Sequence, residues 1–318
     1  MTLEEVDFMK RFFCVLLAVL LLPVLSLAEG PQKVFRDGET DPFPEDAQLL
    51  TLTVCPLLGA DCMLLTFGEH SMLVDIGKET QINTVLEMLH SAGLESVESF
   101  FNTHPHGDHI GGAIPLIEGG LEIGTFYTVF PHDYVERKTA KHYMRDTLKL
   151  LAEKNIPVVD LKTGDTVPFG DVKITVMRIP DESINPYRKC NEMSAMLKVE
   201  YGNCSVLLTA DVEPTVVSQL LLAEMYDLKT DILKYPHHGI SYIRQEFLDE
   251  AAPEYIFFTH SASDTKRMQR FLIRNGYEWM NFATWGPIIC RTDGTKWIVR
   301  QDILPEFENY ARKYKLPK

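Results

Sequence analysis

The stretch FFNTHPHGDHIGG, residues 100–112, places three histidines and one aspartate within six positions. His104 and His106 are two residues apart in a segment expected to be extended, so their side chains project to the same side. Asp108 and His109 follow Gly107, which permits a sharp turn. Neutral imidazoles beside a carboxylate are typical ligands of zinc, and also of manganese or iron. The spacing therefore predicts a metal site in this stretch.

Other metal-type side chains also follow the ends of apolar segments. His104 follows FFNT, Asp211 follows VLLTA, His237 and His238 follow DILKYP, and His260 follows YIFFT. Sheets that carry helices bind ligands at one edge, where strand ends and their loops converge. These side chains are therefore expected to meet in one place.

The rest of the sequence supplies the elements that would position them. Apolar or alternating segments predict strands at 49–54, 63–67, 71–77, 97–103, 124–130, 172–179, 193–201, 204–211, 230–238, 254–260, 287–292 and 296–301. Helical spacing predicts helices at 79–92, 133–154, 213–226, 244–250 and 264–275, with one more directly after His109. Gly202 and Asn203 predict a tight hairpin turn. Strands packed between outer helices are the architecture that this order favours.

The motifs in this order resemble a known family. HPHGDH followed by IGG is similar to the signature of the metallo-β-lactamase fold superfamily. The segments LLGADCMLLTFGEHSMLVDIG, NEMSAMLKVEYGNCSVLLTADVE and DILKYPHHGIS are similar to the hydrolase domain of the competence protein ComEC and its secreted relatives, which include phosphorylcholine esterases. The resemblance runs from about residue 49 to about residue 300. It implies an α/β fold, a four-layer αββα sandwich of the metallo-β-lactamase type.

The resemblance also implies a ligand set for two divalent metal ions. His104 and His106 would hold one ion, Asp108 and His109 the second, and Asp211 would bridge both. Zinc is the expected metal, with Mn²⁺ or Fe²⁺ as alternatives. Two ions about 3.5–4 Å apart can hold a bridging water, lower its pKa towards neutrality and present hydroxide as a nucleophile.

A further imidazole is expected from the PHHG motif, and the sequence does not choose between His237 and His238. Lactamases and glyoxalases of the superfamily place another histidine ligand between the cluster and the bridging carboxylate. Here only His132 and His142 lie in that interval, and both come too early. His260 is a candidate to take that place from another strand end.

Two residues are expected to act in the reaction itself. Asp108 would orient the nucleophile as well as bind metal, and His238 would assist the leaving group. Lys234, Ser241 and Asn191 flank the motifs, and ordinary turn or surface chemistry is the favoured interpretation of each.

Composition limits the function classes. The chain has 318 residues, is 45% hydrophobic and carries a formal net charge of −14, so general nucleic-acid binding is disfavoured. Five of its six cysteines lie beyond the first 28 residues, and none forms a CxxC pair. We therefore expect neither a disulfide-dense scaffold nor a thiolate zinc site, although a bridge between Cys55 and Cys62 is conceivable.

The first residues are typical of a secretory signal peptide. Lys10 and Arg11 precede an apolar run that ends in Ser26 and Ala28, so cleavage is expected after Ala28. An uncleaved membrane anchor is the alternative. The predicted organisation is a signal peptide at 1–28, a linker or N-terminal arm at 29–48, and a hydrolase domain at 49–318.

The motifs, the resemblance and the composition leave three possible functions. The leading one is a secreted, metal-dependent hydrolase of a phosphodiester or phosphomonoester, with a small-molecule or cell-surface substrate. The second is a hydrolase of a carboxylic ester, thioester or lactam. The third is a non-catalytic binding module that retains the fold.

Overall fold

The structure is a computed structural model and describes residues 31–135, 141–178, 189–215 and 226–308. The chain divides into residues 1–32 and residues 33–318, and the following description concerns the second unit. The predicted signal peptide, the anchor alternative and most of the predicted helix 213–226 lie outside the described residues.

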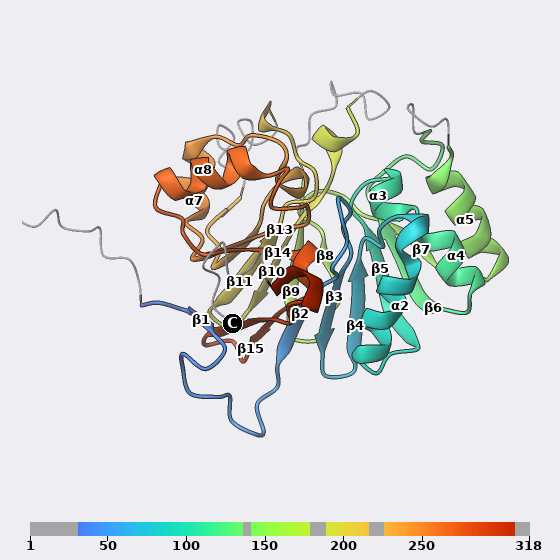
Figure 1. The fold of residues 1–318 in the computed structure, drawn as a ribbon. Coiled ribbons are helices and arrows are strands. Elements are labelled where there is room, and N and C mark those ends of the chain that lie inside the picture. The colour runs from blue at the N-terminus through green and yellow to red at the C-terminus, as the bar shows by residue number, and fades with distance from the viewer. Residues whose placement is uncertain (1–30, 136–140, 179–188, 216–225, 309–318) are drawn as a thin grey trace, which may run out of the picture. The chain divides into compact units, whose positions relative to one another are not determined.

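Two sheets form the centre of this unit (Figure 1). In the described residues the first sheet has the order β1-β16-β15-β2-β3-β4-β5-β6-β7. Its strands are β1 (Val34–Arg36), β2 (Leu50–Val54), β3 (Met63–Phe67), β4 (His70–Val74), β5 (Ser96–Asn102), β6 (Glu122–Thr128), β7 (Val158–Asp160), β15 (Ile288–Thr292) and β16 (Trp297–Gln301). The N-terminal arm thus contributes β1, which pairs in parallel with β16.

The second sheet has the order β14-β13-β12-β11-β10-β9-β8 in the described residues. Its strands are β8 (Thr166–Val167), β9 (Lys173–Met177), β10 (Met196–Tyr201), β11 (Cys204–Leu208), β12 (Ile232–Lys234), β13 (Tyr255–Phe258) and β14 (Met280–Phe282). The hairpin predicted at Gly202 and Asn203 is present, because Tyr201 pairs with Cys204. Strands β11 to β14 run parallel, and so do β4 to β7, which brings their carboxyl ends to one edge of each sheet.

Helices cover the outer faces of the two sheets. The helical elements are η1 (Glu79–Gln81), α2 (Ile82–Ser91), α3 (Gly107–Ile110), α4 (Ala113–Glu118), α5 (Tyr143–Glu153), η2 (Asn191–Met193), η3 (His237–Gly239), α7 (Gln245–Ala251), α8 (Lys266–Arg274), η4 (Ala283–Trp285) and η5 (Pro305–Phe307). Figure 1 shows α7 and α8 beside the second sheet and α2, α4 and α5 beside the first.

Two hydrophobic clusters hold these layers together. The larger contains residues of both sheets, such as Leu52 and Val206, together with Val85 of α2 and Leu151 of α5. The smaller lies between the second sheet and α7 and α8, where Phe247 packs with the strands. Burial of both faces of the sheets explains why strands such as β11 are almost continuously apolar. The layer order is α, β, β, α, as predicted.

Two expectations differ from the structure. In the described residues the helix predicted at 133–154 begins only at Tyr143, and residues 133–135 are not helical; Tyr134 there is buried against Phe130. Cys55 and Cys62 are both buried free thiols, so the conceivable bridge is not formed. In the part of the chain that the structure describes, no helix has the length and apolarity needed to cross a membrane.

Candidate metal centre

Loops from both sheets converge where the parallel strands end. His104 and His106 follow β5, Asp211 follows β11, and His237 and His238 form η3 after β12. Backbone hydrogen bonds tie these loops together. The amide of Asp61 donates to the carbonyl of Asp108 at 3.0 Å, that of His237 to Ala210 at 3.0 Å, and that of Ala195 to Thr103 at 3.1 Å.

Gly107 allows the turn that the sequence predicted after His106. A Cβ atom at this position would lie 2.8 Å from the Tyr143 ring of α5, so only glycine fits there without movement. The chain can therefore turn from the extended His104–His106 segment into α3, which carries Asp108 and His109.

One group of ligand-type side chains is fully buried. It consists of Asp61, His109, Asp211 and His238, whose ligand atoms all lie within 4.8 Å of one another. Asp211 Oδ2 lies 3.3 Å from the Nε2 atoms of both His109 and His238. Asp108 borders this group, with Oδ2 3.6 Å from His238 Nε2. The structure thus brings four predicted ligands together, namely Asp108, His109, Asp211 and His238.

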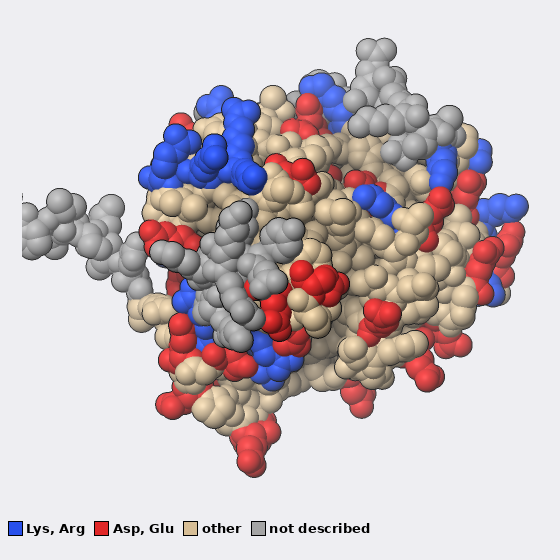
Figure 2. Space-filling model, in the orientation of Figure 1, with Lys and Arg blue, Asp and Glu red and all other residues tan. Residues whose placement is uncertain are grey.

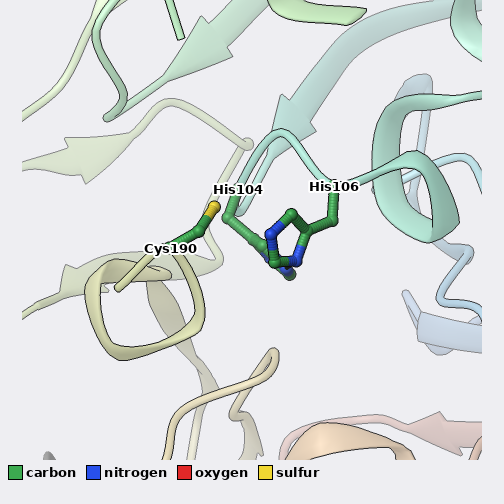
Figure 3. Close-up of side chains that lie close together, drawn as sticks. All are labelled: His104, His106 and Cys190. Carbon is green, nitrogen blue, oxygen red and sulfur yellow. Dashed lines mark hydrogen bonds between the residues drawn. The ribbon is translucent and has the colours of Figure 1, made fainter. Parts of the chain in front are cut away.

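A second group lies beside the first and contains His104, His106 and Cys190 (Figure 3). His104 Nε2 and His106 Nδ1 face each other at 3.2 Å. Asp211 Oδ2 lies 3.9 Å from His104 Nε2. The Asp211 carboxylate therefore lies next to both groups, where a bridging ligand is expected.

Two buried aspartates orient the imidazoles of the first group. Asp75 Oδ2 accepts a hydrogen bond from His109 Nδ1 at 2.6 Å, and Thr103 donates to the same carboxylate. Asp61 Oδ1 accepts from His238 Nδ1 at 2.9 Å and from the Thr259 hydroxyl at 2.6 Å. Carboxylates that fix one ring nitrogen of a histidine leave the other free to bind metal. Each Nε2 atom consequently faces Asp211.

A buried lysine completes the support of Asp61. Lys234 Nζ lies 2.7 Å from Asp61 Oδ2, and both side chains are fully buried. Its ammonium also donates to the carbonyl of Ala210 at 2.8 Å. Lys234 is therefore part of the interior, and its interpretation as an ordinary turn or surface position was wrong. Asp61 Oδ1 accepts hydrogen bonds from His238 and Thr259, and Oδ2 pairs with the Lys234 ammonium, so we assign Asp61 to positioning although it lies within the ligand group.

The electrostatics of the first group favour a bound cation. Burial alone would lower the pKa of His238, but the carboxylates of Asp211 and Asp61 raise it to about 10. Burial would also lower the pKa of His109, but Asp211 and Asp75 raise it well above its usual value. The carboxylates thus hold protons on both imidazoles, at positions where a divalent ion would replace them.

In the second group the pKa values of the histidines are lowered instead of raised. Burial, together with the neighbouring His109 and His106, lowers the pKa of His104 well below its usual value. Burial and His109 likewise lower the pKa of His106 to about 4. Both rings are therefore neutral, and neutral imidazole is the form that binds metal.

Several buried polar atoms lack a hydrogen-bond partner among the described residues. They include Asp211 Oδ1, His109 Nε2 and His238 Nε2. Buried polar atoms are seldom left unpaired, because each such atom costs roughly 1–3 kcal/mol. The two imidazole nitrogens both face the Asp211 carboxylate. This combination of imidazole and carboxylate donors fits divalent metal ions.

The backbone around the centre is strained. Asp75, Ala210, His237 and His238 have positive φ angles of 56°, 47°, 48° and 54°. Non-glycine residues in this conformation cost on the order of 1–3 kcal/mol each and concentrate at functional sites. All four strained residues either belong to the centre or directly precede one of its residues, so the strain accompanies the turns that place these side chains.

The choice between His237 and His238 left open by the sequence has a structural basis. His238 is almost fully buried within the first group, whereas the His237 side chain is 21% exposed at its rim. His237 Nδ1 contacts Glu213 Oε1 at 2.8 Å and Ser241 Oγ at 2.7 Å. Its Nε2 atom lies 3.6 Å from Asp211 Oδ2.

His260 belongs to neither ligand group. Its Nδ1 atom accepts a hydrogen bond from the amide of Ser261 at 2.9 Å and lies 3.2 Å from Asp264. The two earlier histidines are also elsewhere, since exposed His132 pairs with Asp160 and His142 precedes α5.

Four residues at the centre were not proposed from the sequence as part of it: Asp61, Asp75, Lys234 and Cys190. The sequence could have indicated the two aspartates. Asp75 directly follows β4, as the predicted ligands follow their strands, and Asp61 closely precedes β3, which is antiparallel to β4 and so begins at the same edge. Cys190 gives no motif of its own.

Positive charge gathers on one part of the surface near this edge. Figure 2 shows Lys and Arg side chains clustered in the region of α8. The helix supplies Lys266, Arg267, Arg270 and Arg274, all exposed. Such a patch on an acidic protein can attract anionic molecules.

Comparisons with known proteins concern the fold of the chain. A model of the metallo-beta-lactamase superfamily matches residues 55–120, which include Asp61, Asp75 and the histidine cluster. No curated protein sequence matches the chain.

Solved structures with a similar fold include the metallo-beta-lactamase fold protein YhfI from Bacillus subtilis. It is 14% identical, with a TM-score of 0.52 and coverage of 77% of this chain and 100% of that chain. CmlA, a diiron beta-hydroxylase from Streptomyces venezuelae, is 14% identical, with a TM-score of 0.46 over 82% of this chain and 55% of that chain. The family-model match and the likeness to YhfI show that the described unit has the metallo-β-lactamase fold, as predicted, whereas the ComEC-like branch stays a prediction.

Proposed function

We propose that the chain is a secreted, metal-dependent hydrolase of phosphoesters, with phosphodiesters as the leading class. The observation that carries the proposal is the pair of adjoining ligand groups with Asp211 between them. His104 and His106 would hold one ion, and Asp108, His109 and His238 the other. Zinc is the proposed metal, because imidazole and carboxylate ligands suit it. Two bound ions would activate a water molecule and neutralise the charge of a phosphate group.

Asp108 is placed to act on the reacting water. Its side chain is 32% exposed, whereas that of Asp211 is 2% exposed. Burial would raise the pKa of Asp108, but the neighbouring imidazoles of His238 and His109 lower it to about 2. The carboxylate is therefore ionised and can orient a nucleophile from the open side.

His237 is better placed than His238 to assist the leaving group. Asp61 fixes His238 deep in the centre, so its Nε2 atom suits ligation. Glu213 Oε1 accepts from Nδ1 of the more exposed His237, so Nε2 would take the proton that the attacking water loses and pass it to the departing oxygen. This proposal moves the expected proton donor by one residue.

A phosphoester is favoured over a lactam or thioester on two grounds. No described histidine between His109 and Asp211 joins either ligand group, unlike the pattern of lactamases and glyoxalases implied by the resemblance. The cationic face of α8 also favours an anionic substrate such as a phosphoester over a neutral carboxylic ester. A cell-surface or small-molecule phosphoester is the proposed substrate, and general nucleic-acid binding is disfavoured by the net charge of −14.

A panel of chromogenic substrates tests the proposal. The mature protein should hydrolyse bis(p-nitrophenyl) phosphate or p-nitrophenylphosphorylcholine, and should not hydrolyse nitrocefin. Asp108→Asn, which keeps the side-chain volume, should reduce phosphoester turnover at least about a hundredfold. Turnover of nitrocefin alone would support the lactam alternative. Wild-type turnover of the phosphoesters by Asp108→Asn would remove the activity from this centre.

Secretion is part of the proposal and has a separate test. The mature N-terminus should be Glu29, which the intact mass of protein from the culture medium would reveal. A membrane-bound protein that retains residues 9–28 would instead support the anchor alternative.

A further inference from the structure

We propose that Cys190 is the third protein ligand of the ion held by His104 and His106, which makes this a mixed imidazole–thiolate site. The inference rests on the proposed metal centre but not on the identity of the substrate. It differs from the sequence-based expectation that the chain has no thiolate zinc site.

The geometry supports a three-residue site. The ligand atoms of His104, His106 and Cys190 all lie within 4.8 Å of one another. The two nitrogens are 3.2 Å apart, close to the separation of about 3.3 Å that bonds of 2.0–2.1 Å impose around a tetrahedral zinc ion. Cys190 is only 5% exposed and is not in a disulfide. Figure 3 shows it reaching from the η2 turn toward the segment that carries both histidines.

The fold fixes the sulfur in this position. Cys190 is the N-cap of η2, and the turn is closed by hydrogen bonds from the amide of Met193 to the carbonyls of Lys189 and Cys190. Two residues later, the amide of Ala195 donates to the carbonyl of Thr103 at 3.1 Å. The strand that follows Cys190 is therefore tied to the residue directly before His104.

A second observation indicates that an ion belongs between these side chains. Asp211 is 1% exposed, its Oδ2 atom lies 3.9 Å from His104 Nε2, and its Oδ1 atom has no hydrogen-bond partner among the described residues. A carboxylate so buried requires cationic neighbours. The Arg178 guanidinium, which interacts electrostatically with Cys190, would partly offset the charge of a thiolate.

His237 is the competing candidate for the third ligand position. Its Nε2 atom lies 3.6 Å from Asp211 Oδ2, but also 3.3 Å from the Asn191 amide nitrogen. It is not a member of the group that contains His104 and His106. Cys190 is a member, and a sulfur ligand would give the site a preference for softer ions such as zinc, iron or cadmium over manganese or magnesium.

Cobalt(II) substitution provides a direct test. Metal-free full-length mature protein loaded with two equivalents of cobalt(II) should show a near-ultraviolet thiolate-to-cobalt charge-transfer band. Cys190→Ala should abolish the band and weaken the binding of one equivalent at least about tenfold, since even outer-shell changes cost 10–100-fold. Cys190→His should restore binding without the band. Cys204→Ala, which removes another buried thiol, should retain both.

Each alternative outcome overturns the inference. Two bound ions with no charge-transfer band would remove Cys190 from the site but leave the proposed metal centre intact. A band that persists in Cys190→Ala would assign the ligand to another thiol. Failure to bind any metal would overturn both this inference and the proposed hydrolase centre.

Thiol alkylation gives a second readout that does not depend on activity. Iodoacetamide should label Cys190 slowly in the metal-free protein, because the side chain is 5% exposed, and two equivalents of zinc should lower that labelling rate at least about tenfold. Equal labelling with and without bound zinc would contradict ligation by the sulfur.

Discussion

The buried pair of Asp61 and Lys234 has two separable roles, and replacing Asp61 by Asn should reveal both. The substitution keeps the volume of the side chain and removes its charge. It leaves the ammonium of Lys234 buried, donating to the Ala210 carbonyl at 2.8 Å. It also removes the carboxylate that orients His238 Nδ1 at 2.9 Å.

The magnitude follows from the burial of both partners. Lys234 Nζ and Asp61 Oδ2 are 2.7 Å apart, and both side chains are fully buried. Removing one partner of a buried pair leaves an uncompensated charge and costs about 3–5 kcal/mol. We therefore expect Asp61→Asn to lower the unfolding free energy of the metal-free protein by that amount.

A double variant separates stability from metal binding. Lys234→Met removes the ammonium and fills its space, so Asp61→Asn combined with Lys234→Met should recover most of the lost stability. The asparagine oxygen can still accept from His238 Nδ1, but the negative charge that supports His238 as a metal ligand would be missing. Zinc affinity should therefore stay weakened by about 10–100-fold in both the single and the double variant.

Urea unfolding in the presence of a chelator measures the first effect, and zinc competition against a chromophoric chelator measures the second. A stability loss below about 1 kcal/mol for Asp61→Asn, the size typical of an exposed pair, would refute the reasoning about burial. Unchanged zinc affinity in the double variant would refute the role of Asp61 in supporting His238 as a metal ligand.

Three further predictions follow from the same geometry. Phe101→Ala should lower the unfolding free energy by about 3–5 kcal/mol in urea melts, because Phe101 is fully buried, while the folded fraction keeps its metal content. Glu213→Gln should reduce kcat at least about tenfold with KM and metal content unchanged, because Glu213 positions His237; an unaltered kcat would contradict proton transfer by His237. Zinc at a free concentration of about 100 times its Kd should stabilise the stripped protein by about 2.7 kcal/mol per site, seen as a higher Tm in thermal melts; an unchanged Tm would contradict binding to the folded state.

The sequence predicted what local spacing can encode. The HPHGDH motif lies within six consecutive positions, so it can be recognised locally. The structure brings its four ligand-type side chains to one edge, together with Asp211 and His238. Strands packed between outer helices followed from periodicity and from strand ends, both of which are visible in a single sequence. The four-layer αββα order came from the family resemblance.

The supporting residues could not be predicted in this way, because their partners are distant in the chain. Asp61 meets His238 across 177 positions, and Lys234 is buried only because Asp61 is there to neutralise it. A lysine at the end of a strand otherwise favours the surface. Cys190 was likewise missed, because its proximity to His104 arises from the pairing of Ala195 with Thr103.

The helix predicted at 133–154 was too long for a related reason. Apolar spacing continued through Tyr134, but that ring packs against Phe130 and lies 6.2 Å from the His106 ring. Tertiary contacts beside the metal centre thus override the local helical pattern, which is expected of a weak intrinsic preference.

The central claim is that two metal ions held around Asp211 hydrolyse a phosphoester. Titration of the chelator-stripped mature protein with zinc, while turnover of bis(p-nitrophenyl) phosphate is followed, tests it most directly. We expect no turnover without zinc and a turnover rate that rises to a plateau at two equivalents, which Asp211→Ala should fail to reach. Hydrolysis by two ions would be contradicted by full turnover in the stripped protein, by a plateau at one equivalent, or by no turnover with two ions bound.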